Sequence, residues 1–167
     1  MEAARRHPGR MGQVVVVAST PCFVQRPGWS CAVEPSVFEG FAEALQGDPE
    51  GTLKRFLALQ AKGVPGARDV VRFLNQAVLE RGLPSRPALE AGLAILAESD
   101  LRDYLGDESS PGFILGGRDR LVPPEVGDAL GGQARVRVLP EAGHAPFVSH
   151  PQAFCEQLRS LIDVPAG

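Results

Sequence analysis

The 167-residue sequence lacks several features that would place it in a specialised class of protein. No run of apolar residues is long enough to cross a bilayer, and the first residues hold no apolar stretch of the kind that a secretory signal needs. Its three cysteines, Cys22, Cys31 and Cys155, are an odd number at scattered spacing, which fits neither a disulfide framework nor a metal-binding pattern. We therefore expect a cytoplasmic protein with reduced thiols, no metal and no bound cofactor.

Lysine is scarce, and the chain carries a net charge of −3. Positive charge nevertheless gathers between residues 50 and 86, where seven basic side chains face three acidic ones, a local net charge of +4. Arg68 and Arg72 in this segment are four residues apart and would share one helix face. Such a patch is either a solvated helix face or a docking surface for an acidic partner. Nucleic acid is disfavoured, because no aromatic residues interleave with the basic ones and the chain is acidic overall.

The hydrophobic pattern predicts an α/β fold with parallel strands. The β-branched run at 13–19 does not alternate with polar residues and predicts a strand that is buried on both faces. Helical spacing and caps predict four helices, beginning near 35, at 48–50, near 65 and near 87, before strands at 112–116 and 134–139 and helices from 123 and 151. Four helices inserted between strands are typical of a cap, so residues 1–34 and 105–167 are expected to form a partial core and residues 35–104 a helical cap.

Each of the last two strands is followed by a glycine-rich turn that carries a catalytic type of side chain, Asp119 in the first turn and His144 in the second. A Ser–His–Asp triad needs a carboxylate that orients the imidazole of its base. Taken alone, Asp119 could be a local Asx-turn residue and His144 a partly buried structural histidine, as His150 is interpreted. Their order and spacing favour the triad of an α/β-hydrolase, in which the acid precedes the histidine and a serine precedes both.

A convincing serine nucleophile is missing from the sequence. Ser30 lies in Gly28-Trp-Ser-Cys-Ala32, which approaches the G-x-S-x-G pattern, but Pro27 precedes it and Pro35 follows in an irregular stretch. The nucleophile elbow requires a strand leading in and a helix leading out. Cys22 and Cys31 are weaker candidates still. We expect the elbow to lie outside these 167 residues.

On these residues the chain closely resembles the pimeloyl-acyl-carrier-protein methyl ester carboxylesterases of biotin synthesis, a family of α/β-hydrolases. The resemblance covers nearly the whole chain and is looser over residues 83–101. It rests on Val17-Ala-Ser-Thr-Pro-Cys-Phe23, Arg55-Phe-Leu-Ala-Leu-Gln60, Asp119-Arg-Leu-Val-Pro123 and His144-Ala-Pro-Phe-Val-Ser-His-Pro151.

The resemblance implies a role for three groups of residues. Asp119 and His144 would be the acid and base of the triad. The acyl channel would be lined by Phe56, Leu57, Ala58, Leu59 and Gln60, and the acidic carrier protein would be held by Arg55, Arg68 and Arg72. The implied reaction is hydrolysis of the methyl ester at the far end of a pimeloyl chain that is still attached to acyl-carrier protein, by an enzyme that is monomeric at full length.

The resemblance also implies that the family's first strands, its oxyanion loop and its serine elbow would precede residue 1. These 167 residues alone are then expected to show no esterase turnover, because a triad without serine and oxyanion donors cannot form an acyl-enzyme. Two alternatives remain open. One is a different α/β-hydrolase, such as a generic carboxylesterase, a lactonase or a C–C hydrolase. The other is a carrier-binding remnant without catalysis.

Overall fold

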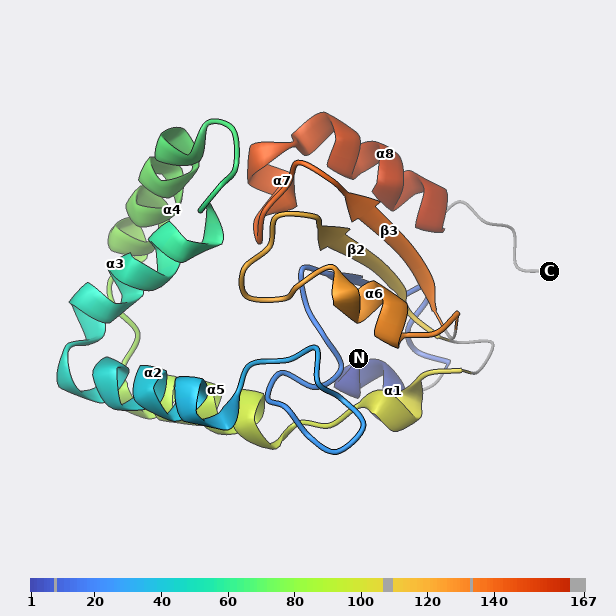
Figure 1. Cartoon of the computed structure of the whole chain (residues 1–167), viewed down its shortest axis with the longest axis horizontal. Helices are drawn as coiled ribbons and strands as arrows, with labels where there is room; N and C mark the ends of the chain where they lie inside the picture. Colours follow the sequence, from blue (N-terminus) through green and yellow to red (C-terminus); the bar gives the residue numbers. More distant parts are fainter. Residues whose placement is uncertain (8, 107–109, 133, 163–167) are drawn as a thin grey trace.

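A computed structural model describes residues 1–7, 9–106, 110–132 and 134–162, and Figure 1 shows a small sheet between helices beside an arm of further helices. The sheet consists of β1 (Val15–Val17), β2 (Gly112–Gly116) and β3 (Arg135–Leu139). Around it lie α1 (Glu2–Arg6), the 3-10 helix Arg102–Tyr104, α6 (Glu125–Ala129), α7 (Pro146–Ser149) and α8 (Pro151–Ile162). The arm consists of α2 (Pro35–Gly47), α3 (Pro49–Gln60), α4 (Ala67–Arg81) and α5 (Arg86–Glu98). Parts of the expected core, residues 107–109 and 163–167, lie outside the described residues.

The sheet is parallel, as predicted, with the strand order β1-β2-β3 and β2 at its centre. Successive side chains of a strand point to opposite faces. Phe113 and Leu115 therefore face a cluster that includes Val126 of α6, while Ile114 faces Leu161 of α8. Because both faces of β2 are covered, every residue of this strand is buried, and its carboxyl end is held rigidly.

The first strand differs from its prediction. It spans Val15–Val17 instead of 13–19, and all three residues are only partly buried. Among the described residues β1 has a strand neighbour on one side, β2, which fits its partial burial. The strand ends before Ala18, whose φ of +44° departs from extended backbone.

The predicted helices of the arm are confirmed, and their ends follow from local chemistry. The Asp48 carboxylate accepts a hydrogen bond from the Gly51 N–H at 2.9 Å and caps α3, with Pro49 at its first position. Helix α4 begins at Ala67, two residues later than predicted, because Gly66 has a φ of +72° and cannot belong to a helix.

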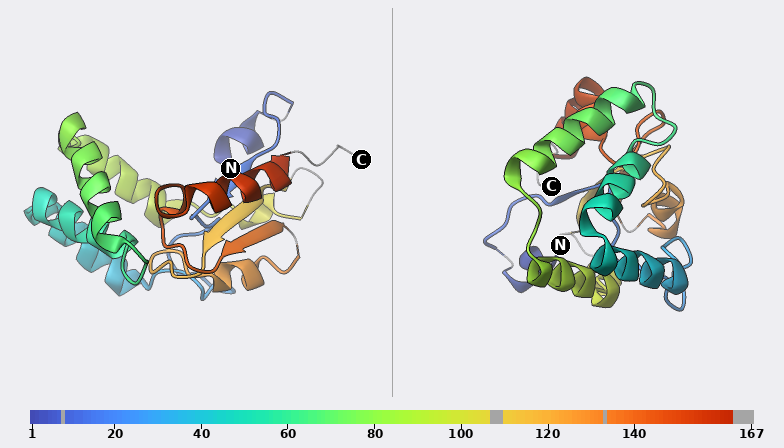
Figure 2. Two further views of the ribbon diagram at one scale, coloured as in Figure 1. Left: turned by 90° about the horizontal axis from the view of Figure 1, so that it is seen from above. Right: turned by 90° about the vertical axis from the view of Figure 1, so that its left-hand side faces the viewer.

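The arm is made of helix pairs, α2 with α5 and α3 with α4 (Figure 2). An aromatic pair joins α2 to α3, with the rings of Phe41 and Phe56 5.3 Å apart at their centroids. The arm contacts the part of the molecule that holds the sheet where α4 packs on α7. The end of α3 also contacts the loop that precedes α7, through the hydrogen bond from the N–H of His144 to the carbonyl of Gln60.

Two arginines fasten the irregular segment 20–33 to the end of α5 and to the 3-10 helix that follows it. The guanidinium of Arg26 donates to the carbonyl of Ala97 at 2.8 Å, and that of Arg102 donates to the carbonyl of Pro27 at 2.9 Å. Arg102 also pairs with Asp100, and its hydrogen bonds hold the pKa of that carboxyl below its usual value. Arginine near a helix C-terminus satisfies carbonyls that have no partner within the helix.

Across the described ranges, no helix has both the length and the apolar character needed to cross a membrane. The same residues contain no cluster of three or more histidine, cysteine, aspartate or glutamate side chains that could hold a metal ion.

The packing of α8 on the sheet predicts a large cost for one truncation. Leu161 is fully buried, and a Cβ on Gly112 of β2 would lie only 3.1 Å from its Cδ1. Leu161→Ala is expected to lower the free energy of unfolding by about 2–5 kcal/mol, because it leaves a cavity under the sheet. Urea unfolding measures this change, and Ile162→Ala, at a side chain that is 46% exposed, is the control. Equal losses in the two variants would show that α8 does not pack on the sheet in this register.

Candidate active site

Asp119 lies in a tight turn immediately after the central strand β2. Its backbone N–H donates to the carbonyl of Gly116 at 3.2 Å, which closes the turn. Its carboxylate Oδ1 accepts from the N–H groups of Leu121 at 2.8 Å and Val122 at 3.0 Å. The Asx-type bonds that a purely structural aspartate would make are therefore present, and they use only one carboxylate oxygen.

The second oxygen of Asp119 holds a histidine. Its Oδ2 lies 2.9 Å from Nδ1 of His144, which follows β3 and precedes α7. The side chain of Asp119 is fully buried, whereas that of His144 is 22% exposed. The structure thus brings the two residues together, as expected for the turns at the carboxyl ends of neighbouring parallel strands.

This geometry determines which nitrogen of the ring can act as a base. A carboxylate accepts and does not donate, so its partner Nδ1 carries the proton, and the lone pair remains on Nε2. No other described residue forms a hydrogen bond to the His144 ring. The arrangement can therefore accept a proton at Nε2 and stabilise the resulting imidazolium through the buried carboxylate, which is the acid–base half of a triad.

The two turns are in close backbone contact. A Cβ added at Gly116 would lie 2.2 Å from the carbonyl oxygen of Gly143 and 2.6 Å from that of Ala142. Only glycine permits this approach. The residue that ends β2 therefore brings the aspartate turn within reach of the histidine loop.

The segment expected to line an acyl channel lies in the second half of α3. Because consecutive helical residues are 100° apart, its five members cannot share one environment. Phe56 packs on Phe41, Leu57 is buried, and Ala58 and Leu59 line a groove between α3 and α4. The carbonyl of Gln60 accepts a hydrogen bond from the backbone N–H of His144 at 3.2 Å. The end of this segment therefore touches the histidine loop directly.

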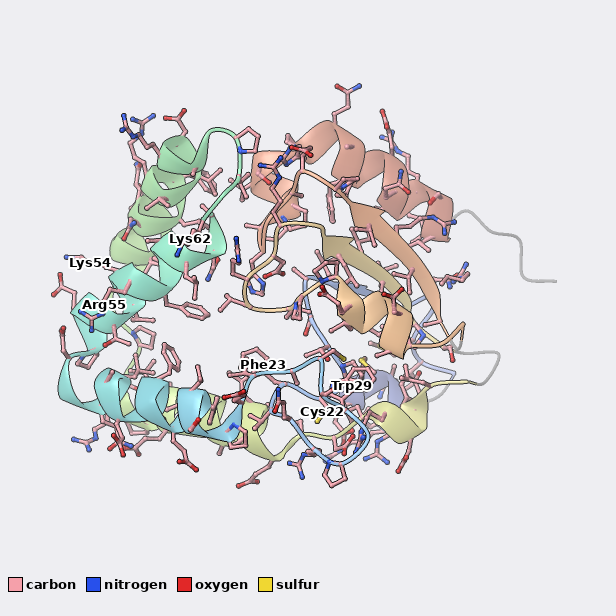
Figure 3. The ribbon with its side chains drawn as sticks, viewed as in Figure 1. Cys22, Phe23, Trp29, Lys54, Arg55 and Lys62 are labelled. Atoms are coloured by element: carbon pink, nitrogen blue, oxygen red, sulfur yellow. The ribbon has the colours of Figure 1, made fainter. Side chains whose placement is uncertain are left out.

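The predicted cationic residues divide into two groups. Arg55 and Arg68 line the same groove between α3 and α4, a hollow of about 600 Å³ with an apolar floor. Arg72 is not among the lining residues and pairs with Asp69 at 2.5 Å. Lys62, just beyond the end of α3, also lines the groove. Figure 3 labels Lys62 and Arg55, which lie along α3 and the turn that follows it. Lys62 contributed to the charge count but was not predicted as a binding residue.

The alternative nucleophiles lie in unsuitable surroundings. Ser30 is exposed in an irregular segment, with no strand leading in and no helix leading out. Cys22 is buried beside Trp29, whose indole N–H donates to the Cys22 carbonyl at 3.0 Å (Figure 3). Burial raises the pKa of the Cys22 thiol and that of Cys31, which disfavours the reactive thiolate.

Two charged residues beside the site were missed by the sequence analysis. Arg118 directly precedes Asp119, and its Nη1 donates to the carbonyl of Gly63 in the turn after α3 at 2.7 Å. The same guanidinium pairs with Glu141, three residues before His144. The position of Arg118 next to the aspartate was the available signal, but its partners are remote in sequence.

Comparison with known proteins agrees with this fold. The family model described as the alpha/beta hydrolase family matches residues 2–157. The chain belongs to this family.

Among relatives of known name, the pimeloyl-[acyl-carrier protein] methyl ester esterase of Aeromonas hydrophila is 44% identical over 165 residues, covering 96% of this chain and 65% of the relative. The protein of the same name from Klebsiella pneumoniae is 43% identical over 164 residues, covering 96% of this chain and 63% of the relative. The chain therefore spans less than two thirds of the length of these relatives. A solved esterase from Exiguobacterium antarcticum superposes with a TM-score of 0.80 at 21% identity, over 98% of this chain and 62% of that one, which supports the fold.

Proposed function

We propose that this chain supplies the acid and the base of a serine carboxylesterase that acts in biotin biosynthesis. Its substrate would be the methyl ester of a pimeloyl chain attached to acyl-carrier protein, and its location the cytoplasm. The hydrogen bond between Asp119 and His144 carries this proposal. The identity of the chain to esterases of that name supports the choice of substrate.

In the proposed reaction, a serine supplied from outside residues 1–167 gives its proton to Nε2 of His144 as its oxygen attacks the ester carbonyl. The imidazolium, stabilised by Asp119, then gives that proton to the departing methoxide, which leaves as methanol. Water attacks the resulting acyl-enzyme and passes a proton to the same nitrogen. The histidine returns that proton to the serine oxygen, which releases the free carboxylate and restores the enzyme. Methyl ester and water thus become carboxylic acid and methanol.

The proposal assigns different tasks to the two parts of the chain. Residues 1–34 and 105–167 would form the part of the core that holds the acid and base, and residues 35–104 the cap. Phe56–Gln60 would guide the acyl chain, since Gln60 already contacts the histidine loop. Arg55 and Arg68, on one groove, and Arg72 nearby on α4 would attract an acidic carrier protein.

A carrier-binding module without catalysis is the second candidate. One observation favours it: the groove holds Arg55, Lys62 and Arg68 over an apolar floor. Under this alternative Asp119 and His144 would be retained from a catalytic ancestor without activity of their own, and the cationic groove alone would be functional.

The deciding experiment uses the native product from its source cells, with its intact mass and N-terminal peptide determined first. Purified product is expected to release methanol from the carrier-linked pimeloyl methyl ester. Arg68→Glu is expected to raise KM by about fivefold or more at low salt, with kcat unchanged and an effect that fades as salt screens the charges. Arg159→Glu, the same charge change at an exposed position on α8, is the control.

Three results would contradict the proposal in different ways. Hydrolysis of short p-nitrophenyl esters without hydrolysis of the carrier-linked ester would indicate another α/β-hydrolase. Salt-sensitive carrier binding without methanol release would favour the binding module. Equal changes in KM for Arg68→Glu and Arg159→Glu would show that the cap arginines do not form the docking surface.

A further inference from the structure

Arg118 connects three segments that are far apart in the sequence. It lies in the aspartate turn, and its Nη1 donates to the carbonyl of Gly63 at 2.7 Å. Its Nη2 pairs with Glu141, which lies three residues before His144 in the histidine loop. The Gly63 carbonyl belongs to the turn after α3. One guanidinium thus joins the cap to both turns of the candidate active site.

The cap turn and the histidine loop also touch each other through the backbone. The N–H of His144 donates to the carbonyl of Gln60 at 3.2 Å. A Cβ added at Gly143 would lie 2.7 Å from that same carbonyl oxygen and 2.7 Å from Cγ2 of Val64. The contact is therefore tight enough that a small opening of the cap turn would break it.

One of the two carbonyls in these contacts, that of Gln60, is among those that the end of a helix leaves unpaired. Helix α3 ends at Gln60, so its last carbonyls have no partner within the helix. His144 supplies a donor to one of them, and Arg118 supplies a charged donor to the turn that follows. A cation is favoured at this end of a helix, which carries partial negative charge.

We propose that Arg118 is a positioning residue that latches the turn 61–66 of the cap onto the aspartate and histidine turns. The latch holds the backbone of His144 against α3 and keeps the end of the acyl-guiding segment in place beside the ring. Its effect on catalysis rests on the proposed function, whereas the latch itself is a structural property of these residues.

The contact to Gly63 contributes more to the latch than the ion pair does. The side chains of Arg118 and Glu141 are 42% and 57% exposed, and exposed ion pairs add little stability. The hydrogen bond from the guanidinium to the carbonyl is the link that spans cap and core. Glu141→Gln should therefore disturb the latch much less than Arg118→Ala does.

Lysine should restore the latch only in part. Arginine presents several donors in a planar fork and can reach a carbonyl and a carboxylate at the same time. Lysine carries a single ammonium on a flexible stem, so Arg118→Lys is expected to keep one of the two contacts at a time.

The latch is tested by hydrogen exchange at the backbone N–H of His144 in the 167-residue chain. Arg118→Ala is expected to speed this exchange by about five- to tenfold, as loss of a hydrogen bond would allow local opening. Arg118→Lys should fall between, and Glu141→Gln should stay within about twofold of the unchanged chain. Arg120→Ala, an exposed arginine two residues away with no ion pair among the described contacts, is the control. Amides of β2 report global stability and should not change.

Equal His144 exchange in the Arg118→Ala and Arg120→Ala variants would overturn the latch, and so would faster exchange throughout β2. The catalytic consequence is measured separately in the native product. Arg118→Ala should raise KM for the long carrier-linked ester by more than threefold, because the acyl-guiding segment is no longer held in place, whereas Arg120→Ala should leave KM for the same ester unchanged. If the native product hydrolyses no ester, the proposed function fails, but the exchange result still decides the latch.

Discussion

Replacing Asp119 with asparagine is expected to lower kcat/KM for ester hydrolysis by about 10³- to 10⁴-fold while leaving the fold intact. The amide oxygen can still accept the N–H groups of Leu121 and Val122, which lie at 2.8 and 3.0 Å from Oδ1. The amide NH₂ then faces Nδ1 of His144 and donates to it. The ring proton is forced onto Nε2, where the lone pair is needed, so the histidine is present but holds the wrong tautomer.

Two measurements separate this effect from a loss of structure. Nitrogen NMR of the histidine ring in the 167-residue chain should show the proton on Nδ1 in the unchanged sequence and on Nε2 in the variant. Kinetics of the native product give kcat/KM, with Asp128→Asn, at an exposed position on α6, as the control. Activity above about a tenth of the original, or an Nε2 proton before substitution, would show that Asp119 does not orient the base.

The meeting of Asp119 and His144 was predictable from the sequence because it depends on topology. Each residue follows a strand within a few positions, and neighbouring parallel strands end at the same edge. The contacts of Arg118 were not predictable in this way. Its acceptor is a backbone carbonyl 55 residues earlier, and every residue has a carbonyl, so no side-chain pattern marks Gly63. The same holds for Lys62, which reaches the groove only through the way α3 and α4 pack.

For the fold, predictions succeeded where the chemistry is local and failed where it depends on neighbours. Asp48 and Pro49 mark the start of α3 through capping, and the structure forms that cap. The β-branched residues at 13–19 indicated a strand correctly. The burial of that strand depends on which strands flank it, and β1 lies at the edge of the described sheet. Helix α7 was missed because its four residues are too few to show a hydrophobic period.

Gly116→Ala is expected to lower the free energy of unfolding by about 3 kcal/mol or more, although it adds a single methyl group. The new Cβ would lie 2.2 Å from the carbonyl oxygen of Gly143 and 2.6 Å from that of Ala142. Both obstacles are backbone oxygens of buried residues, so neither can rotate away as a flexible side chain would. Relief requires the histidine loop to move away from the end of β2, which is buried on both faces.

The comparison that tests this is Gly92→Ala in α5, where an added Cβ meets nothing within 4 Å. Alanine is the better helix former, so this second variant should gain about 0.5–1 kcal/mol. Urea midpoints at unchanged slope measure both changes. Because the movement that relieves Gly116→Ala also separates Asp119 from His144, the Nδ1 proton signal should weaken in any fraction of the variant that still folds. A variant with an unchanged midpoint and an unchanged ring signal would show that the two turns do not approach as closely as 2.2 Å implies, and that the glycine is not what brings the acid to the base.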